Sequence, residues 1–414
     1  MNGSSHPSAL ETGVRWVARS AGRGFLVVFL ISFGLRGGFL ALAPAEYFLA
    51  DTGWEVGSVA QSLAETGEFA NPYAVPTGAT AHTPPIYPFI LSLIYRLLGV
   101  TVMAGYASWI LTVAGSSAMF GLLPRISGTF GVPREAGVVG GLVGALLPTW
   151  PAQVETLAAL TLAFLLVGFL CRWTSGATTL RGSFLFGMAG GVSFHLSPAL
   201  LPVVVACIGF EVWWRSDRCQ WRSASLVIAG IVFTCLPWAG RNFVIFHDFF
   251  FVRDNLGLEL RVANHEGATI ERTTLSHPRV SVGEARRVRE LGEREYMKQA
   301  RHDAVEWIRA NPAAFLQLSA GRMAYFWFGP LARPTVAFPA LATTLLALVG
   351  ARRLLPRLTI PQRAALAIPL ATYPLIYYFV NYLSRYRVTV EWILLLFAGA
   401  ALWQYISAGR AASA

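Results

Sequence analysis

Long apolar runs, separated by short polar turns that often carry arginine, make up most of the chain. A helix needs about 20 apolar residues to cross the roughly 30 Å hydrocarbon core of a bilayer. Runs of this length or somewhat shorter stand at residues 25–43, 102–123, 136–150, 156–170, 184–194, 198–214, 225–237, 336–348, 364–381 and 391–405. The pattern therefore predicts an all-α polytopic membrane protein with about ten transmembrane helices.

Positive charge orients these runs. The residues that precede the first run include Arg15, Arg19 and Arg23. By the positive-inside rule they place the N-terminus in the cytoplasm, so that residues 44–101 form the first outer loop. The apolar run 86–98 inside this loop is expected to be a second juxtamembrane helix, because counting it as a crossing would invert every later loop. Arg36 within the first run and Pro44 after it favour a retained helix over a cleaved signal peptide. The side chain of Arg36 is expected to extend to the outer surface of the membrane.

The one long polar region divides the chain into three parts. Residues 241–312 contain half of all the acidic residues and are expected to lie outside the membrane. Within them, the stretch 281–312 has one apolar stripe and predicts a solvent-exposed helix, and residues 313–330 predict an interfacial helix. The expected organisation is a transmembrane module over 1–240, an external segment with the interfacial helix over 241–334, and C-terminal transmembrane helices over 335–414.

Composition agrees with this class. The chain is 55% hydrophobic and only 13% charged, with a mean hydropathy of +0.52. The formal net charge of +11 does not indicate nucleic-acid binding, because the basic residues stand mainly at the ends of apolar runs, where topology explains them. The four cysteines show neither CxxC nor Cys/His spacing, and the histidines at 195, 247 and 265 form no cluster in sequence. No required metal or cofactor is therefore expected.

Polar residues gather where the predicted turns reach the outer face. They are Asp51, Glu55, His82, Glu155, Arg241, Asn242, Arg385 and Arg387. The planar guanidinium of arginine binds phosphate oxygens in a bidentate manner, while a carboxylate can orient or deprotonate an acceptor. An acid beside arginines at a membrane surface is thus suited to transfer chemistry on a lipid phosphate.

Several motifs in order make a resemblance specific. They are D-x-x-W at 51–54, A-x-x-L-x-x-T-G-x-F at 60–69, TPPIYP at 83–88, PWAGRNFVIF at 237–246, WIRANPAAFL at 307–316 and SRYR at 384–387. In this order, over nearly the full chain, they resemble the protein O-mannosyltransferase and aminoarabinose lipid A transferase family of GT-C membrane glycosyltransferases. The resemblance implies a polyprenyl-phosphate sugar as donor, consumed outside the cytoplasm with inversion at the anomeric carbon.

The resemblance also implies roles for single residues. Asp51 falls on the essential acid of the first loop, and Glu155 on an acidic position that opens the second outer loop and helps to hold the acceptor, as Glu55 is also expected to do. The expected contacts to the donor phosphate are Arg241, Arg385, Arg387 and His82, and the expected cover over the donor is Glu259 and Asn264. His82 replaces the lysine or arginine of relatives, and Asp51 is followed by Thr52 rather than by a second acid. A neutral histidine weakens the expected contact of position 82 to phosphate. The missing second acid after Asp51, and HLSP at 195–198 where many relatives have an arginine before the proline, count against a protein mannosyltransferase.

Plainer interpretations stand beside these. Asp51 could be the N-cap of a juxtamembrane helix that begins near Thr52, Glu155 could face water at a turn, and the arginine pair at 385 and 387 could flank a helix pair.

The leading hypothesis is an inverting hexosyl or pentosyl transferase in a bacterial inner membrane, acting on a lipid, glycan or protein acceptor, with membrane lipids but no nucleic acid as partners. The rival hypotheses are a transporter or flippase of a lipid-linked sugar and, as the weakest alternative, a membrane scaffold.

Overall fold

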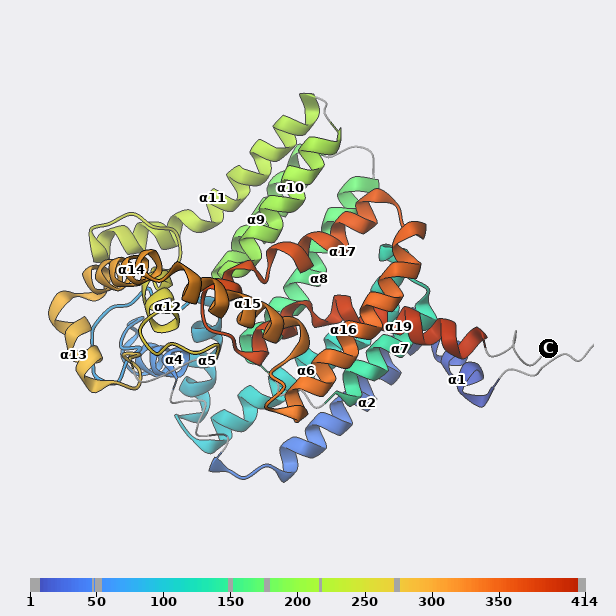
Figure 1. Ribbon diagram of the computed structural model, residues 1–414, viewed down its shortest axis with the longest axis horizontal. Helices are drawn as coiled ribbons and strands as arrows, with labels where there is room; N and C mark the ends of the chain where they lie inside the picture. Colours follow the sequence, from blue (N-terminus) through green and yellow to red (C-terminus); the bar gives the residue numbers. More distant parts are fainter. Residues whose placement is uncertain are drawn as a thin grey trace, which may run out of the picture.

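In the computed structural model, residues 8–46, 48, 54–147, 152–174, 179–215, 218–271 and 276–408 are described. Within these ranges the ordered elements are α-helices, short 3₁₀ helices and two isolated β-bridges (Figure 1). The prediction of an all-α protein is therefore confirmed for the described part of the chain.

Six of the described helical segments are long and apolar enough to cross a membrane. They contain the helices α2 (Ala21–Leu42), α6 (Val102–Ile126), α8 (Gln153–Thr174), α11 (Arg218–Phe246), α16 (Pro334–Leu354) and α19 (Val388–Ala408). The other predicted crossings correspond to shorter helices, namely α7 (Arg134–Leu146), α9 (Leu180–Leu196), α10 (Leu201–Arg215), α17 (Ile360–Thr372) and α18 (Leu375–Phe379). The chain is a multi-pass helical membrane protein, and the figure of about ten crossings stays a prediction.

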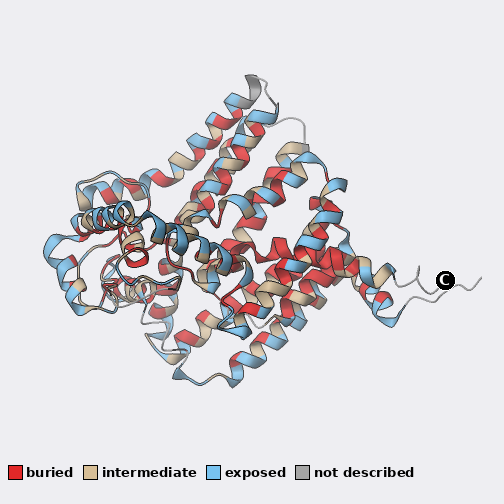
Figure 2. Cartoon of the chain, in the orientation of Figure 1, coloured by how far each residue is buried: buried red, intermediate tan, exposed pale blue. Residues whose placement is uncertain are grey.

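Helix α19 forms the centre of the bundle. It packs against α7, α8 and α16, and 72% of its most apolar window is buried inside the protein (Figure 2). The close approach of α16 and α7 to α19 depends on glycine. A Cβ atom added to Gly350 of α16 would lie 1.8 Å from the carbonyl oxygen of Phe397. A Cβ atom added to Gly140 of α7 would lie 2.4 Å from the carbonyl oxygen of Leu395. Small residues at such crossings let helix backbones touch, as is typical of membrane bundles.

A polar layer caps one end of the bundle. We define the polar layer as residues 54–98 and 248–310 of the described chain. Its helices are α4 (Glu55–Thr66), α5 (Ile86–Leu98), α12 (Leu256–Ala263), α13 (Val282–Leu291) and α14 (Glu293–Ala310). A separate core ties its two segments together, with Tyr73 from the first packed against Leu258, Val288 and Tyr296 from the second.

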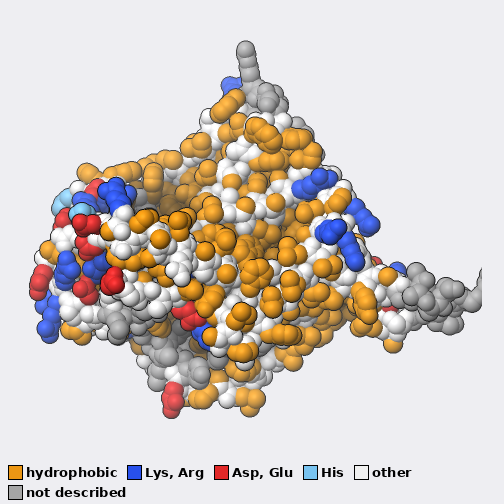
Figure 3. Space-filling view, in the orientation of Figure 1, with side chains coloured by type: hydrophobic (Ala, Val, Ile, Leu, Met, Phe, Trp, Pro, Cys, Tyr) orange, Lys and Arg blue, Asp and Glu red, His pale blue; other side chains and the backbone are white. Residues whose placement is uncertain are grey.

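The surface follows this division. In Figure 3 charged side chains of both signs gather at the left end, over the polar layer, and orange apolar side chains cover the middle of the molecule. A separate group of basic side chains lies to the right, near the connection between α16 and α17, where the sequence has Arg352, Arg353 and Arg357. Mixed charge at one end and basic charge near the other match the pattern of a protein that spans a bilayer.

Four details differ from the sequence predictions. The predicted helix 281–312 is two helices, because Gly292 adopts φ +80° between α13 and α14. The predicted span 364–381 is broken before α18, where Pro374 removes a backbone donor.

Helix α11 continues to Phe246, so Arg241 lies in its last turns and does not open the polar region. Arg36 is buried and donates to the carbonyl of Gly144 at 3.0 Å, and so does not reach the surface.

Two further helices complete the chain. Helix α1 (Ala9–Ala18) precedes α2, and Ser8 caps it by accepting a hydrogen bond from the amide of Glu11. Helix α15 (Pro312–Phe328) connects the polar layer to α16 and coincides with the stretch predicted to be interfacial. The 3₁₀ helices are Ser127–Phe130, Pro198–Leu200, Leu355–Arg357 and η5 (Ser384–Arg387).

Candidate functional site

A cavity of about 1000 Å³ lies between the bundle and the polar layer. Charged side chains and imidazole from both sides line it: Glu55, His82, Glu155, Arg253, Glu259, Glu271, Arg333 and Arg385. Six tyrosines also contribute: Tyr87, Tyr95, Tyr373, Tyr377, Tyr382 and Tyr386. The volume is at the upper end of the range for small-molecule sites, which is roughly 300–1,000 Å³.

On the bundle side, Glu155 and Arg385 form an ion pair. Glu155 lies in the first turn of α8, where the helix dipole favours a negative charge. Arg385 lies on η5, the short turn that leads into α19, and its Nε is 3.2 Å from Oε1 of Glu155. The Arg385 side chain is 54% exposed, so its guanidinium can contact a ligand while it is held by Glu155. Two residues that sequence alone assigned to one site are thus brought together.

Aromatic rings continue this wall of the cavity. The ring of Tyr386 stacks on that of Tyr377 with centroids 4.1 Å apart, and the Arg385 guanidinium lies 5.6 Å from the centroid of Tyr386. Such flat faces present both a π-surface and a phenolic hydroxyl to a ligand. The sequence reading did not single out these tyrosines, because nothing in their spacing distinguishes them from interfacial anchors.

On the polar-layer side, Arg253 joins the predicted residues. Its Nε donates to the carbonyl oxygen of His82 at 3.0 Å, and its side chain lines the cavity. Burial lowers the pKa of Arg253, and the carboxylates of Glu259 and Glu55 oppose that effect. Glu259 in turn accepts a hydrogen bond from the side-chain amide of Asn255 at 3.0 Å. Arg253 was missed by sequence reasoning, because it stands in an aromatic stretch without a recognisable motif.

The loop that carries His82 is anchored by a buried carboxylate. Glu293, at the start of α14, accepts hydrogen bonds from the hydroxyl of Thr80 at 2.5 Å and from the amide of Ala81 at 2.6 Å. Burial raises the pKa of Glu293 to about 7, although these two hydrogen bonds oppose the shift. The contact fixes α14 against the first loop directly before His82.

Three of the residues predicted to contact the donor phosphate or to cover the donor lie away from the cavity lining. Arg241 donates to the carbonyl oxygens of Thr80 at 2.8 Å and Phe69 at 3.2 Å. Asn264 is buried, where its amide donates to the carbonyl of Phe379 at 2.9 Å and its oxygen accepts from Arg322 at 3.1 Å. These side chains hold segments of the backbone in place.

Arg387 is the third. Its guanidinium donates to Thr344 Oγ1 at 2.9 Å and Thr343 Oγ1 at 2.6 Å, and it pairs with Glu391. It is 5% exposed, in contrast to Arg385 two residues earlier. The two arginines of the SRYR motif therefore lie in different environments, and Arg387 supports the turn that presents Arg385.

Asp51 lies outside the described residues. The nearest described residues on each side in sequence, Phe48 and Trp54, both line the cavity. The N-cap residue of α4 is Trp54, since the helix begins at Glu55.

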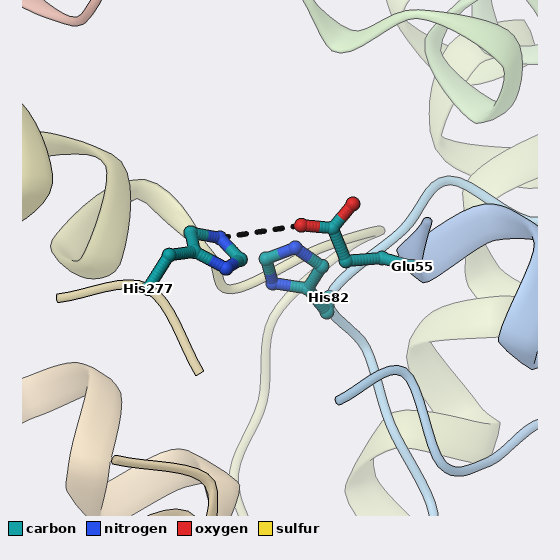
Figure 4. Close-up of side chains that lie close together, drawn as sticks. All are labelled: Glu55, His82 and His277. Atoms are coloured by element: carbon teal, nitrogen blue, oxygen red, sulfur yellow. Dashed lines mark ion pairs between the residues drawn. The ribbon is translucent and has the colours of Figure 1, made fainter. Parts of the chain in front are cut away.

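A third group lies at the edge of the cavity and consists of Glu55 and His82, which line it, and the buried His277, which does not. One potential ligand atom from each lies within 4.8 Å of the others (Figure 4). Nε2 of His277 is 3.3 Å from Oε1 of Glu55. Sequence reasoning paired Glu55 with His82 only loosely and missed His277, because the three residues are far apart in the chain and no spacing rule connects them.

Comparison with protein-family models and with curated protein sequences found no match. Among solved structures, the fold is similar to the crystal structure of the Archaeoglobus fulgidus oligosaccharyltransferase in complex with Zn and sulfate, with a TM-score of 0.47 and 14% sequence identity. The match covers 94% of this chain and 51% of that one, so the chain spans about half the length of that structure. The assignment of a function therefore rests on the residues of the cavity.

Proposed function

We propose that the chain is an inverting glycosyltransferase that moves a hexose or pentose from a polyprenyl-phosphate donor to a lipid, glycan or protein acceptor. The cavity carries this proposal, because it lies at the boundary of an apolar bundle and a polar layer and holds carboxylates opposite arginines. A donor with a lipid tail, a charged phosphate and a polar sugar needs those three environments side by side.

Arg385 and Arg253 are the residues we assign to the donor phosphate. Both line the cavity, one from the bundle and one from the polar layer. Guanidinium groups bind phosphate oxygens through paired N–H donors, and their charge stabilises the phosphate as it leaves. Arg241 and Arg387, expected from the motifs to share this role, support it indirectly by holding the segments that carry His82 and Arg385.

Asp51 is the proposed base. An acceptor hydroxyl attacks the anomeric carbon, the bond from that carbon to the phosphate oxygen breaks, and the hydroxyl proton passes to the Asp51 carboxylate. The released polyprenyl phosphate keeps the electron pair of the broken bond, and the arginines balance its charge. Glu55 and Glu155 orient the acceptor, and Glu259 with Asn264 belongs to the segment that covers the donor.

The distribution of charge supports an orientation. The polar layer, with the cavity beneath it, lies at the end opposite the basic group near the connection of α16 and α17 (Figure 3). If arginine-rich turns face the cytoplasm, the cavity opens on the extracytoplasmic side of a bacterial inner membrane. Donor and acceptor would then meet outside the cell interior.

The test uses the full chain in proteoliposomes, a panel of polyprenyl-phosphate hexoses and pentoses labelled on the sugar, and bacterial membrane extract as the source of acceptor. We expect label transfer and release of polyprenyl phosphate, and a loss of about 10²–10⁴-fold in the Asp51→Asn variant. Glu65→Gln, an exposed acid at the end of α4, is the matched control and should keep full activity.

Two results would overturn the proposal. One is unchanged transfer by Asp51→Asn. The other is movement of the lipid-linked sugar across the bilayer without cleavage of its phosphate bond, equally in wild type and variant, which would favour the flippase hypothesis.

A further inference from the structure

The cluster of Glu55, His82 and His277 joins three segments that meet only in the folded protein. Glu55 is the first residue of α4, His82 lies in the loop before α5, and His277 lies between α12 and α13. Figure 4 shows the carboxylate of Glu55 and the two imidazole rings directed toward a common centre. A carboxylate and two imidazoles are ligands typical of first-row divalent metal ions.

The cluster is enclosed on one side and open on another. His277 is fully buried and His82 is 3% exposed, whereas the side chain of Glu55 is 12% exposed. Glu55 and His82 also line the large cavity. An ion held by the three residues would therefore keep a coordination position that faces the cavity, as is common where a site has three protein ligands.

The distances suit a small ion after a modest contraction. Around a tetrahedral zinc ion with bonds of about 2.0–2.1 Å, two ligand atoms are about 3.3 Å apart. The separation of 3.3 Å between His277 Nε2 and Glu55 Oε1 already has this value. The ligand atoms lie no more than 4.8 Å apart. A small rotation of a side chain, without movement of the backbone, is therefore enough to bring all three within bonding distance of one ion.

Neighbouring hydrogen bonds orient the rings. The hydroxyl of Tyr73 is 3.1 Å from Nδ1 of His82, which directs Nε2 as the ligand atom, in the way that an outer-shell partner fixes a ligating histidine. At His277 the amide of Arg279 donates to Nδ1 at 3.1 Å, so the neutral ring carries its proton on Nε2. Ligation through Nε2 moves that proton to Nδ1 and breaks the bond from the Arg279 amide.

Nearby charge limits the affinity. The carboxylate of Glu55 interacts with the guanidiniums of Arg253 and Arg279, both of which have a pKa lowered by burial. Glu259 also acts on Arg253 and balances one of the two positive charges, but both guanidiniums compete with a bound ion for the Glu55 carboxylate. Together with the hydrogen bond lost at His277, this predicts a dissociation constant in the micromolar range, weaker than that of a closed structural zinc site.

We propose that Glu55, His82 and His277 bind one Zn²⁺ ion, which links the first loop to the external segment at the edge of the cavity. The ion would hold α4 and the loop before α5 against the segment before α13, and so fix the polar-layer wall of the cavity. The proposal does not depend on glycosyl transfer, because binding of the metal is measured without donor or acceptor.

The experiment uses the purified full chain in detergent, treated with EDTA and dialysed, and then titrated with Zn²⁺ against a chromophoric chelator. We expect one Zn²⁺ per chain and a rise in the midpoint of thermal unfolding. His82→Gln and His277→Gln should each lose affinity by about 100-fold, and Tyr73→Phe by about 10-fold, since loss of an outer-shell partner weakens a site by about 10–100-fold. His302→Gln, an exposed histidine on α14, is the matched control and should bind like wild type.

Since His277 is buried, its variant could fail to fold, and a second measurement covers that case. Co²⁺ added to the metal-free wild-type chain should give the intense visible absorption of a tetrahedral site, and the same absorption should be lost in His82→Gln. Less than stoichiometric Zn²⁺ in the wild type, or equal affinity in His82→Gln and His302→Gln, would overturn the proposal. Failure of glycosyl transfer with intact Zn²⁺ binding would instead count against the proposed function alone.

Discussion

The helical bundle and the polar layer use different physics to hold their elements together. In the bundle, backbones touch where glycines face carbonyls, as Gly350 faces Phe397 and Gly399 faces Ala136. The polar layer adds ion pairs to its small apolar core: Arg261 pairs with Glu284, and Arg294 pairs with Asp248. The bundle should therefore be sensitive to added volume, and the polar layer to pH, salt and removal of charge.

Arginine shows the same contrast on a smaller scale. In the bundle, the buried Arg36 donates to the backbone carbonyl of Gly144, and the buried Arg387 adds the hydroxyls of Thr343 and Thr344 to its pairing with Glu391. Arginines of the polar layer find carboxylates within reach. Arg385, at the boundary, pairs with Glu155 yet stays half exposed, and this intermediate position is what makes it suitable for a ligand.

The largest expected effect comes from added volume in the bundle. Gly350→Val places a Cβ 1.8 Å from the carbonyl oxygen of Phe397, and backbone atoms cannot yield to it. We expect a loss of several kcal/mol, about 4 or more, and little monodisperse protein by size-exclusion chromatography. Gly34→Val on α2, where a Cβ meets nothing within 4 Å, is the control. Equal yields of the two variants would contradict the close packing of α16 and α19.

The second prediction separates the two arginines of η5. Arg387→Met leaves the buried Glu391 without its cation, and should destabilise the protein by about 3–5 kcal/mol. Arg385→Met leaves Glu155 facing the cavity, where water can replace the half-exposed guanidinium, and should change stability by about 1 kcal/mol or less while lowering glycosyl transfer by about 100-fold. Thermal unfolding and transfer assays on both variants give the comparison. A matched loss of stability in the two would show that both arginines are structural.

The third prediction concerns pH and the polar layer. The folded-state pKa of Glu293 is raised to about 7 by burial, from 4.5. A raised carboxyl pKa stabilises the fold below 4.5, and this contribution is lost as pH rises through 7, by about 3 kcal/mol in total. Glu293→Gln keeps an acceptor for the Ala81 amide and does not ionise, so it should unfold at a higher temperature than wild type at pH 8 but not at pH 5.

Unfolding scans at the two pH values check this. Glu290→Gln, an exposed neighbour on α13, is the control whose difference from wild type should not change with pH. A pH-independent difference for Glu293→Gln would mean that the carboxyl ionises in the folded protein as it does in water.

The sequence was sufficient for the helical class and for much of the cavity wall. Apolar run length identified the long helices, and the run 86–98 is a separate helix, α5, as expected. Motif order and charge on one face selected Glu55, Glu155 and Arg385, which line one cavity although they are distant in the chain. These residues could be found because a charged group at the end of an apolar run has few structural reasons to be there.

Other features depend on where side chains point. Arg385 and Arg387 are two residues apart and equally polar, yet one lines the cavity and the other is buried in protein contacts. The role of His277 depends on the contact of the segment between α12 and α13 with Glu55 of α4, and that of Arg253 on a contact with the backbone of His82. Such tertiary contacts leave no periodic trace in a single sequence. The positive φ of Gly292 could have been inferred, since a glycine inside a polar helical stretch often ends it.

The smallest expected effect compares two arginines that share one carboxylate. Arg261, 13% exposed, donates to Glu284 and to the hydroxyl of Tyr296, whereas Arg287 is 43% exposed and lies 4.0 Å from Glu284. Arg261→Gln should destabilise the polar layer by about 1.5–3 kcal/mol, because a partly buried charged hydrogen bond is lost. Arg287→Gln should change it by about 0.5 kcal/mol or less, and by less still at high salt.

Urea unfolding of both variants at low and high salt distinguishes them. If Arg287→Gln were as damaging as Arg261→Gln, the net charge around Glu284 rather than the geometry of one guanidinium would hold α12 to α13. Any change of charge near Glu284 would then change the stability of the polar layer. The polar layer would differ from the bundle because long-range electrostatics, and not individual contacts, would hold its helices together.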